Sequence, residues 1–217
     1  MSAEVPVGAP EQDAVSEILS RQRLAFVVVA LLVEAVLFFV GLFTPLSGPA
    51  RQSLANQTSS QFGNLTAGPP AQLVAYIFTH NLSIALPEMI PIAGALLFGI
   101  SVYSTGLAAQ ALVASQGLPA QWGVVIFAFP YSLVELTAYA VAVVSGFALL
   151  AAWRKGRLRR ELRVFVLEGV AVTCILLVAA AMEVATVRVS VALGLALWLP
   201  TGLALAAAMV FAGRRRA

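Results

Sequence analysis

Long apolar blocks constrain the fold of this chain more than any other feature of its sequence. A membrane-spanning helix needs about 20 mostly apolar residues, and five blocks reach this length: 24–43, 91–112, 124–150, 164–184 and 189–211. Of the 217 residues, 60% are hydrophobic and 11% are charged, so little sequence is left for a soluble domain. We therefore expect an all-α, polytopic transmembrane helical bundle that forms one domain over residues 23–217.

The basic residues cluster beside the ends of these blocks. Arg21 and Arg23 precede the first block, six Lys and Arg residues lie within 154–163, and residues 214–216 are all Arg. The positive-inside rule predicts cytoplasmic N- and C-termini and a basic cytoplasmic loop over residues 153–163. The same charges attract anionic lipid head groups. A basic patch can also bind nucleic acid, but the position beside helix ends favours a role in topology, and we expect no nucleic-acid partner.

Two polar segments flank the first block. Residues 1–22 are predicted to form a cytoplasmic tail with a short amphipathic helix, because apolar residues recur there at helical spacing. Residues 45–72, rich in Ser, Gly, Pro, Asn and Gln, are predicted to form an external loop. This loop holds two Asn-x-Thr triplets, so Asn56 and Asn64 are candidate glycosylation sites in a cell with the required machinery. A loop of this composition often contains such a triplet by chance.

Parity limits the number of crossings in the middle of the chain. With the first loop outside and residues 153–163 inside, an odd number of crossings must lie between them. We expect three, over residues 73–86, 91–114 and 121–150, which makes about six membrane segments, five long and one short. The first of the three is short and the last is long at a rise of about 1.5 Å per residue. A broken or re-entrant helix would explain both lengths.

A glutamate interrupts the apolar stretch over residues 121–153. A carboxylate at the bilayer centre is unfavourable by roughly 2.5–3.5 kcal/mol, so Glu135 is expected to face the protein interior. Tyr131, Ser132 and Tyr139 share a helical face with it. Two interpretations remain open. Glu135 either joins helices through hydrogen bonds, or forms a proton, ion or substrate site.

Other residues are expected to complete this interior. A second polar stripe on the preceding apolar segment could face the first, and it consists of Ser101, Ser104, Thr105 and Gln110. Gly94, Gly99 and Gly146 are small enough for close helix approach. Glu34 lies deep in the first block and requires a partner, whereas Glu168 is close enough to the basic loop to pair with Arg160 or Arg163.

Common catalytic motifs are absent from the sequence. It has no phosphate-binding glycine loop, no His-Glu-x-x-His and no Gly-x-Ser-x-Gly. The single histidine, His80, and the single cysteine, Cys174, cannot supply the converging ligands of a metal site. We therefore expect a chain without enzymatic activity, metal or cofactor.

An ordered series of motifs resembles the stage II sporulation protein M family of integral membrane proteins. That family typically shows Phe-x-x-Asn, a glycine-bearing helix, and Pro-His-Gly-x-x-Glu-Leu-x-Ala before another glycine. The corresponding residues here are Phe78, Asn81, Gly94, Gly99, Gly106, Pro130, Glu135 and Gly146. The likeness covers residues 77–150.

The sequence departs from the family pattern at two places. Tyr131 and Ser132 replace the His-Gly pair, and Thr105-Gly106 stands where Asn-Gly is common. A role of that histidine is therefore not carried over. In sporulating bacteria the family member acts as a membrane scaffold with peptidoglycan-degrading partners during engulfment, but relatives also occur in organisms that do not sporulate. The resemblance implies a non-enzymatic membrane component, without implying sporulation.

Three functions are compatible with these features. The first is a non-enzymatic membrane scaffold or assembly subunit in the cell membrane, with lipids and other membrane proteins or further copies of itself as partners. The second is a transporter permease or channel subunit that uses the buried carboxylates Glu34 and Glu135. The third is an accessory subunit of a larger membrane complex.

Overall fold

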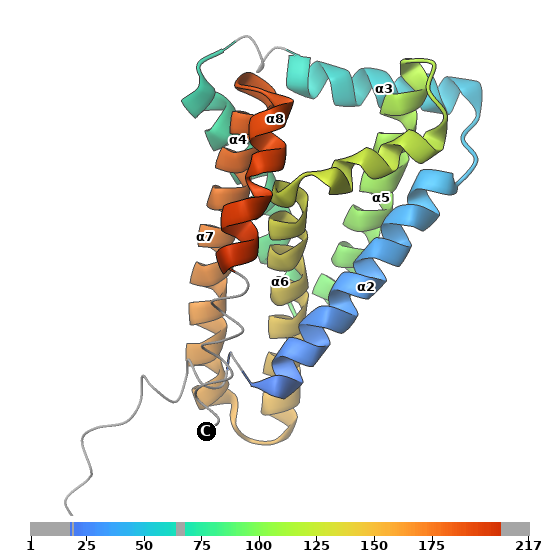
Figure 1. Cartoon of the computed structure of the whole chain (residues 1–217). Helices are drawn as coiled ribbons and strands as arrows, with labels where there is room; N and C mark the ends of the chain where they lie inside the picture. The colour runs from blue at the N-terminus through green and yellow to red at the C-terminus, as the bar shows by residue number, and fades with distance from the viewer. Residues whose placement is uncertain (1–17, 19, 64–67, 205–217) are drawn as a thin grey trace, which may run out of the picture.

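The computed structural model describes residues 18, 20–63 and 68–204, and within these residues it contains helices and no β-strand (Figure 1). Its elements are α2 (Arg21–Phe43), α3 (Gly48–Gly63), α4 (Pro70–Glu88), α5 (Ala93–Ser115), η1 (Ala120–Ala128), α6 (Pro130–Arg154), α7 (Leu158–Arg188) and α8 (Val191–Ala196). The amphipathic helix predicted near the N-terminus lies outside the described residues.

Four of the described helices are long and apolar enough to cross a membrane, namely α2, α5, α6 and α7. Large apolar side chains on these helices are more than half exposed, among them Val28 (54%), Leu96 (67%) and Val166 (62%). Extended apolar surfaces of this kind mark contact with a membrane or with other proteins. The apolar stretch Ala192–Ala204 is shorter, and the rest of the last predicted crossing lies outside the described residues. The predicted all-α bundle of membrane helices is confirmed.

The long apolar stretch before the basic loop is broken into two helices. The 3₁₀ helix η1 runs obliquely from the end of α5 to the start of α6 (Figure 1). Phe129 between them is extended, with φ −106° and ψ 135°, as a residue before proline prefers. Pro130 then occupies the first turn of α6, where no backbone N–H is needed. The proline therefore changes the chain direction, and the break explains why this stretch is too long for one crossing.

Helices α4 and α5 form a hairpin whose turn packs against the middle of α6. A Cβ built on Gly146 would come 2.7 Å from the backbone oxygen of Met89, so the turn backbone lies directly on α6. Ile92 in this turn has a φ of +68°, which a β-branched residue rarely adopts. Gly146 precedes the end of α6 at Arg154 by eight residues, or about 12 Å of helix. The hairpin thus stops about 12 Å short of the end of α6.

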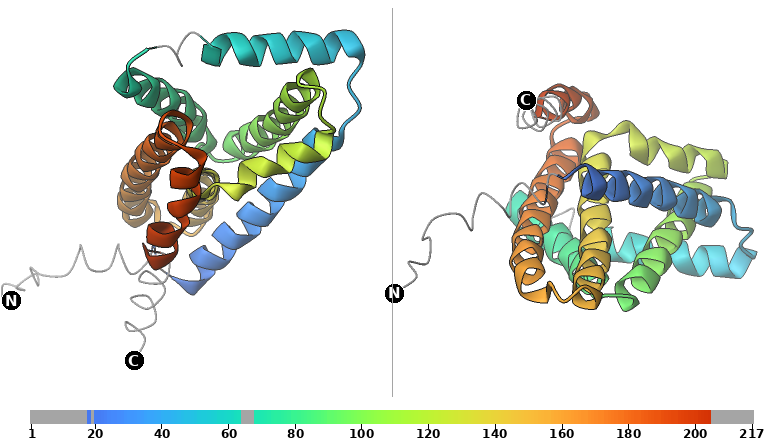
Figure 2. Two further views of the ribbon diagram at one scale, coloured as in Figure 1. Left: turned by 45° about the horizontal axis from the view of Figure 1, so that its top comes forward. Right: turned by 90° about the horizontal axis from the view of Figure 1, so that it is seen from below.

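The segment between α2 and α4, predicted as a loop, contains helix α3. This helix lies across the end of the bundle opposite the α6–α7 turn (Figures 1 and 2). Most of its side chains are exposed, including Asn56, while Asn64 lies outside the described residues. Ala55 is only 2% exposed, because α3 packs against α5. The polar composition correctly predicted that the side chains of this segment are exposed. It did not reveal the helix, because the contact of α3 with α5 depends on the tertiary structure.

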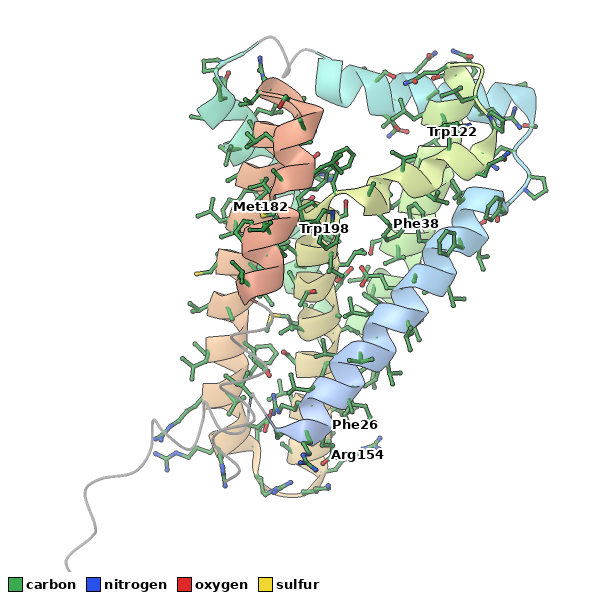
Figure 3. The ribbon with its side chains drawn as sticks, in the orientation of Figure 1. Phe26, Phe38, Trp122, Arg154, Met182 and Trp198 are labelled. Atoms are coloured by element: carbon green, nitrogen blue, oxygen red, sulfur yellow. The ribbon has the colours of Figure 1, made fainter. Side chains whose placement is uncertain are left out.

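Helices α2 and α5 pack backbone against backbone through a pair of glycines. A Cβ on Gly41 would overlap the carbonyl oxygen of Tyr103, and a Cβ on Gly106 would overlap that of Phe38. Such close approach is typical of small residues at membrane helix interfaces. Beside this contact the rings of Phe38 and Phe127 pack edge to face, with centroids 4.9 Å apart. Phe38 is labelled on α2 in Figure 3.

Replacement of Gly106 by alanine should destabilise the bundle by about 1–2 kcal/mol, because the added methyl group overlaps backbone atoms of α2. Gly99→Ala on the same helix is the matched control, since a Cβ there meets only a Leu37 methyl group at 3.9 Å. Thermal unfolding of the two purified variants in detergent measures the difference. Equal melting temperatures would contradict the close packing of α2 on α5.

Candidate functional site

The centre of the candidate site is the carboxyl group of Glu135, in the second turn of α6. The Tyr139 hydroxyl donates a hydrogen bond to Glu135 Oε1 at 3.0 Å. The side chain of Asn81, from α4, forms another hydrogen bond with the same carboxyl group. Asn81 and Tyr139 are both buried, with 7% and 8% exposure. Two residues of the motif, 54 positions apart, therefore join α4 to α6, as the structural interpretation of Glu135 requires.

The other members of the predicted stripe on α6 have different partners. The Ser132 hydroxyl donates to the backbone oxygen of Ile126 at 2.7 Å, which ties the first turn of α6 to η1. The Tyr131 ring stacks on that of Phe129, with centroids 5.6 Å apart and an interplanar angle of 14°. The helical face was predicted correctly, but within it only Tyr139 bonds to Glu135.

Two more carboxyl groups lie close to Glu135 in the interior. Glu34 of α2 is fully buried, and neither of its carboxyl oxygens has a hydrogen-bond partner among the described residues. Glu88, at the end of α4, is 1% exposed and accepts a hydrogen bond from the Ser101 hydroxyl at 2.7 Å. Glu88 and Glu135 are both near enough to interact electrostatically with Glu34. We call Glu34, Glu88 and Glu135 the carboxyl cluster.

Glu88 was not among the candidate residues identified from the sequence. In the sequence, Glu88 lies in the connection between two predicted membrane segments, where water would solvate its carboxyl group. Its burial results from the position of the α4–α5 turn against the middle of α6. The signal in the sequence was a single acidic residue between Pro87 and Pro91, with apolar segments on either side. Glu183 of α7 also interacts electrostatically with Glu135.

The polar stripe on α5 does not face the stripe on α6, and that prediction is wrong. Ser101 bonds to Glu88, while the Gln110 side chain donates to the backbone oxygen of Thr44 at 3.0 Å. Ser104 and Thr105 are exposed. The reason is the glycine contact between α2 and α5, which turns the buried face of α5 towards α2 rather than α6.

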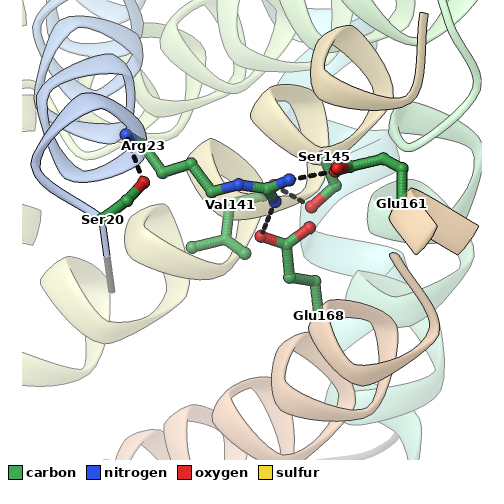
Figure 4. A network of polar contacts seen from close by, with 6 residues as sticks. All are labelled: Ser20, Arg23, Val141, Ser145, Glu161 and Glu168. Carbon is green, nitrogen blue, oxygen red and sulfur yellow. Dashed lines mark hydrogen bonds and ion pairs between the residues drawn. The ribbon is translucent and has the colours of Figure 1, made fainter. Parts of the chain in front are cut away.

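A second buried polar network lies at the opposite end of α6 and joins α2 to α7. Arg23 forms ion pairs with Glu161 and with Glu168, the latter at 2.5 Å (Figure 4). All three residues are less than 10% exposed. The prediction that Glu168 pairs with Arg160 or Arg163 is therefore wrong. Those arginines are exposed on α7, whereas Arg23 reaches Glu168 from the neighbouring helix.

The remaining motif residues mediate packing. Phe78 contacts both apolar cores, and Gly94 lies so close to the Glu88 backbone that a Cβ would overlap it. Gly106 and Gly146 make the close backbone contacts with α2 and with the α4–α5 turn. Gly99 differs, because an added Cβ would meet only a Leu37 methyl group, at 3.9 Å.

The carboxyl cluster presents buried oxygen atoms, which accept hydrogen bonds and bind protons. In the part of the chain that the structure describes, no three His, Cys, Asp or Glu side chains are placed to hold a metal ion. His80 is exposed and its ring stacks on Tyr76, with centroids 6.2 Å apart. Cys174 is exposed on α7.

Comparison with known proteins agrees with the motif. Residues 24–188 match the family model described as Stage II sporulation protein M (SpoIIM). The matched segment runs from the start of α2 to the end of α7 and contains the whole carboxyl cluster. No curated protein and no solved structure gave a match. Because the match covers well over half of the sequence, the chain belongs to the stage II sporulation protein M family.

Proposed function

We propose that the chain is a non-enzymatic scaffold or assembly subunit, a multi-pass protein of the cell membrane that holds partner proteins. Membership of the stage II sporulation protein M family supports this proposal. So does the use of the motif residues Asn81 and Glu135, which join two helices of the same chain and thereby stabilise a fixed frame. We define the basic turn as residues 154–163, between α6 and α7, and propose that it faces the cytoplasm.

The observation that carries the proposal is the charge distribution in the basic turn. Its six Lys and Arg side chains are all exposed, while its single acidic residue, Glu161, points inward and pairs with Arg23. Basic side chains therefore outnumber acidic ones at the outer surface of the turn. Such a surface suits an acidic segment of a partner protein, because complementary charge steers association and selects among partners.

Charge reversal in the first turn of α7 tests this proposal. Arg159 and Arg163 are four residues apart, share a helical face and are exposed. Arg159→Glu/Arg163→Glu should reduce the stoichiometric partner recovered from native membranes at least about tenfold, because it reverses the attraction. Arg51→Glu, an exposed charge reversal on α3 at the other end of the bundle, should have no effect. Quantitative mass spectrometry after mild solubilisation measures both.

Two results would contradict the scaffold proposal. One is a purified chain that is monomeric and has no stoichiometric partner. The other is proton or cation flux in proteoliposomes that disappears in Glu135→Gln, which would identify a transporter. We expect no flux, and a Glu135→Gln variant that still assembles with its partners, because an amide can keep hydrogen bonds to Tyr139 and Asn81.

A further inference from the structure

A groove of about 850 Å³ lies between α2, α5 and α6 and ends at the basic turn. Its walls are mainly apolar, with Phe26 and Val33 from α2, Phe98 from α5, and Val144 and Phe147 from α6. Phe26 and Phe147 are 53% and 51% exposed, so both long walls reach the surface that faces the membrane. The volume falls in the range of about 300–1,000 Å³ that is common for ligand pockets.

The groove is about as deep as one leaflet of a bilayer. Along α6 its lining extends from Val143 to Ala152 and on to Lys155, which follows the helix. Twelve residues of helix correspond to about 18 Å, compared with about 15 Å for half of a 30 Å hydrocarbon core. Ala95, Phe98 and Gly99 close the inner end, because the α4–α5 hairpin stops short of the basic turn and α5 begins there.

Positive charge surrounds the outer end of the groove. Lys155 and Arg157 line it and are exposed, and Ser20 and Gln22 add polar groups. Arg23 and Glu161 also line it, but they form an ion pair with each other. The charges left for a ligand are therefore those of Lys155 and Arg157. In the bundle as a whole, Phe26 and Arg154 lie at this same end (Figure 3).

We propose that this groove binds an anionic glycerophospholipid from the leaflet on the side of the basic turn. An acyl chain lies between α2 and α6, with its end towards Gly99, and the phosphate group lies at Lys155 and Arg157. The charge at the mouth selects an anionic head group over a zwitterionic one. The two exposed basic side chains at the outer end favour a phosphate group over the apolar surface of a partner's transmembrane helix.

The experiment uses the full chain, purified in detergent and delipidated, with thermal unfolding followed at increasing phospholipid concentration. Phosphatidylglycerol should raise the melting temperature through binding to the folded state. Phosphatidylcholine should bind at least about tenfold more weakly, because it lacks the net negative charge. Glycerol 3-phosphate should have no effect, since it has no acyl chain to fill the groove. Mass spectrometry of the native complex should show about one bound phosphatidylglycerol per chain.

Two pairs of variants locate the site. Lys155→Glu/Arg157→Glu should abolish the preference for phosphatidylglycerol, whereas Arg159→Glu/Arg163→Glu changes charge as much but outside the groove lining and should retain it. Gly99→Leu should reduce binding of both lipids at least about tenfold by filling the groove. A Cβ added at Gly99 meets only a Leu37 methyl group, at 3.9 Å, and no backbone atom within 4 Å. Gly202→Leu, at an exposed glycine with no atom within 4 Å of an added Cβ, is its control.

The results that overturn the proposal are equally defined. Equal shifts with phosphatidylglycerol and phosphatidylcholine, or a shift with glycerol 3-phosphate as large as that with phosphatidylglycerol, would exclude an anionic lipid as the specific ligand. If the Gly99→Leu variant binds phosphatidylglycerol as tightly as the unmodified chain, the groove is not the lipid-binding site. The groove would then be available to a protein segment or to bulk lipid. Loss of lipid preference in Arg159→Glu/Arg163→Glu would show that the whole turn attracts lipid without a site. These outcomes are independent of whether partner proteins bind.

Discussion

Substitution of Arg23 by methionine is expected to destabilise the bundle by about 3–5 kcal/mol, because it leaves two buried carboxylates without their cation. Glu161 and Glu168 are 6% and 4% exposed, and each forms its ion pair with Arg23. Methionine replaces the aliphatic part of the arginine, so the loss is mainly electrostatic. Denaturant unfolding in detergent gives the change in free energy, and the melting temperature should fall in parallel.

Arg21→Met is the matched control, since Arg21 is exposed two residues earlier on the same helix. Its effect should stay within about 0.5 kcal/mol. A triple variant, Arg23→Met/Glu161→Leu/Glu168→Leu, should recover most of the lost stability, because apolar replacement of a whole buried ionic network is often neutral or stabilising. If Arg23→Met and Arg21→Met unfold alike, the buried network does not hold α2 to α7.

Glu34→Leu is expected to have the opposite effect and to stabilise the bundle by about 1–3 kcal/mol. The carboxyl group of Glu34 is fully buried, and neither of its oxygens has a hydrogen-bond partner among the described residues. A buried polar group without a partner is unfavourable by about that amount. Leucine occupies a similar volume and has no polar atoms to satisfy. Thermal and denaturant unfolding of the purified variant in detergent measure the gain.

Glu135→Leu is the contrasting variant within the same cluster. It removes an acceptor that Tyr139 and Asn81 use, so it should lower stability by about 1–3 kcal/mol. Glu34→Leu should raise the free energy of unfolding and Glu135→Leu should lower it. This difference would distinguish a carboxyl group that joins helices from one that does not. A destabilised Glu34→Leu would mean that Glu34 has a partner in the membrane, contrary to the arrangement described.

The sequence was sufficient to predict the class of the fold and one of its decisive contacts. Apolar blocks about 20 residues long determine membrane helices almost regardless of detail, and the excess length of the block over residues 121–150 predicted that it could break. The helical spacing of Tyr139 and Glu135 also predicted that they share a face, because that depends only on the residues per turn. Asn81 and Glu135 were identified together through the family pattern, and they do meet.

The sequence did not reveal which neighbouring helix each helical face contacts. Glu168 has several arginines nearby in the sequence, yet it pairs with Arg23, which is 145 positions away. Spacing along a helix gives no information on which other helix lies opposite, and the stripe on α5 was assigned to the wrong neighbour for this reason. Glu88 was missed because its burial depends on where the hairpin turn lies in the bundle.

The short α4–α5 hairpin also makes the two ends of the bundle differ in width. At the level of the basic turn, the described bundle consists of α2, α6 and α7, whereas α3, α4 and α5 widen the other end (Figures 1 and 2). A wedge of this kind displaces more lipid area from one leaflet than from the other. We therefore expect the lateral pressure of the bilayer to act unevenly on the two ends, and the spacing between α2 and α6 to respond to membrane composition and curvature.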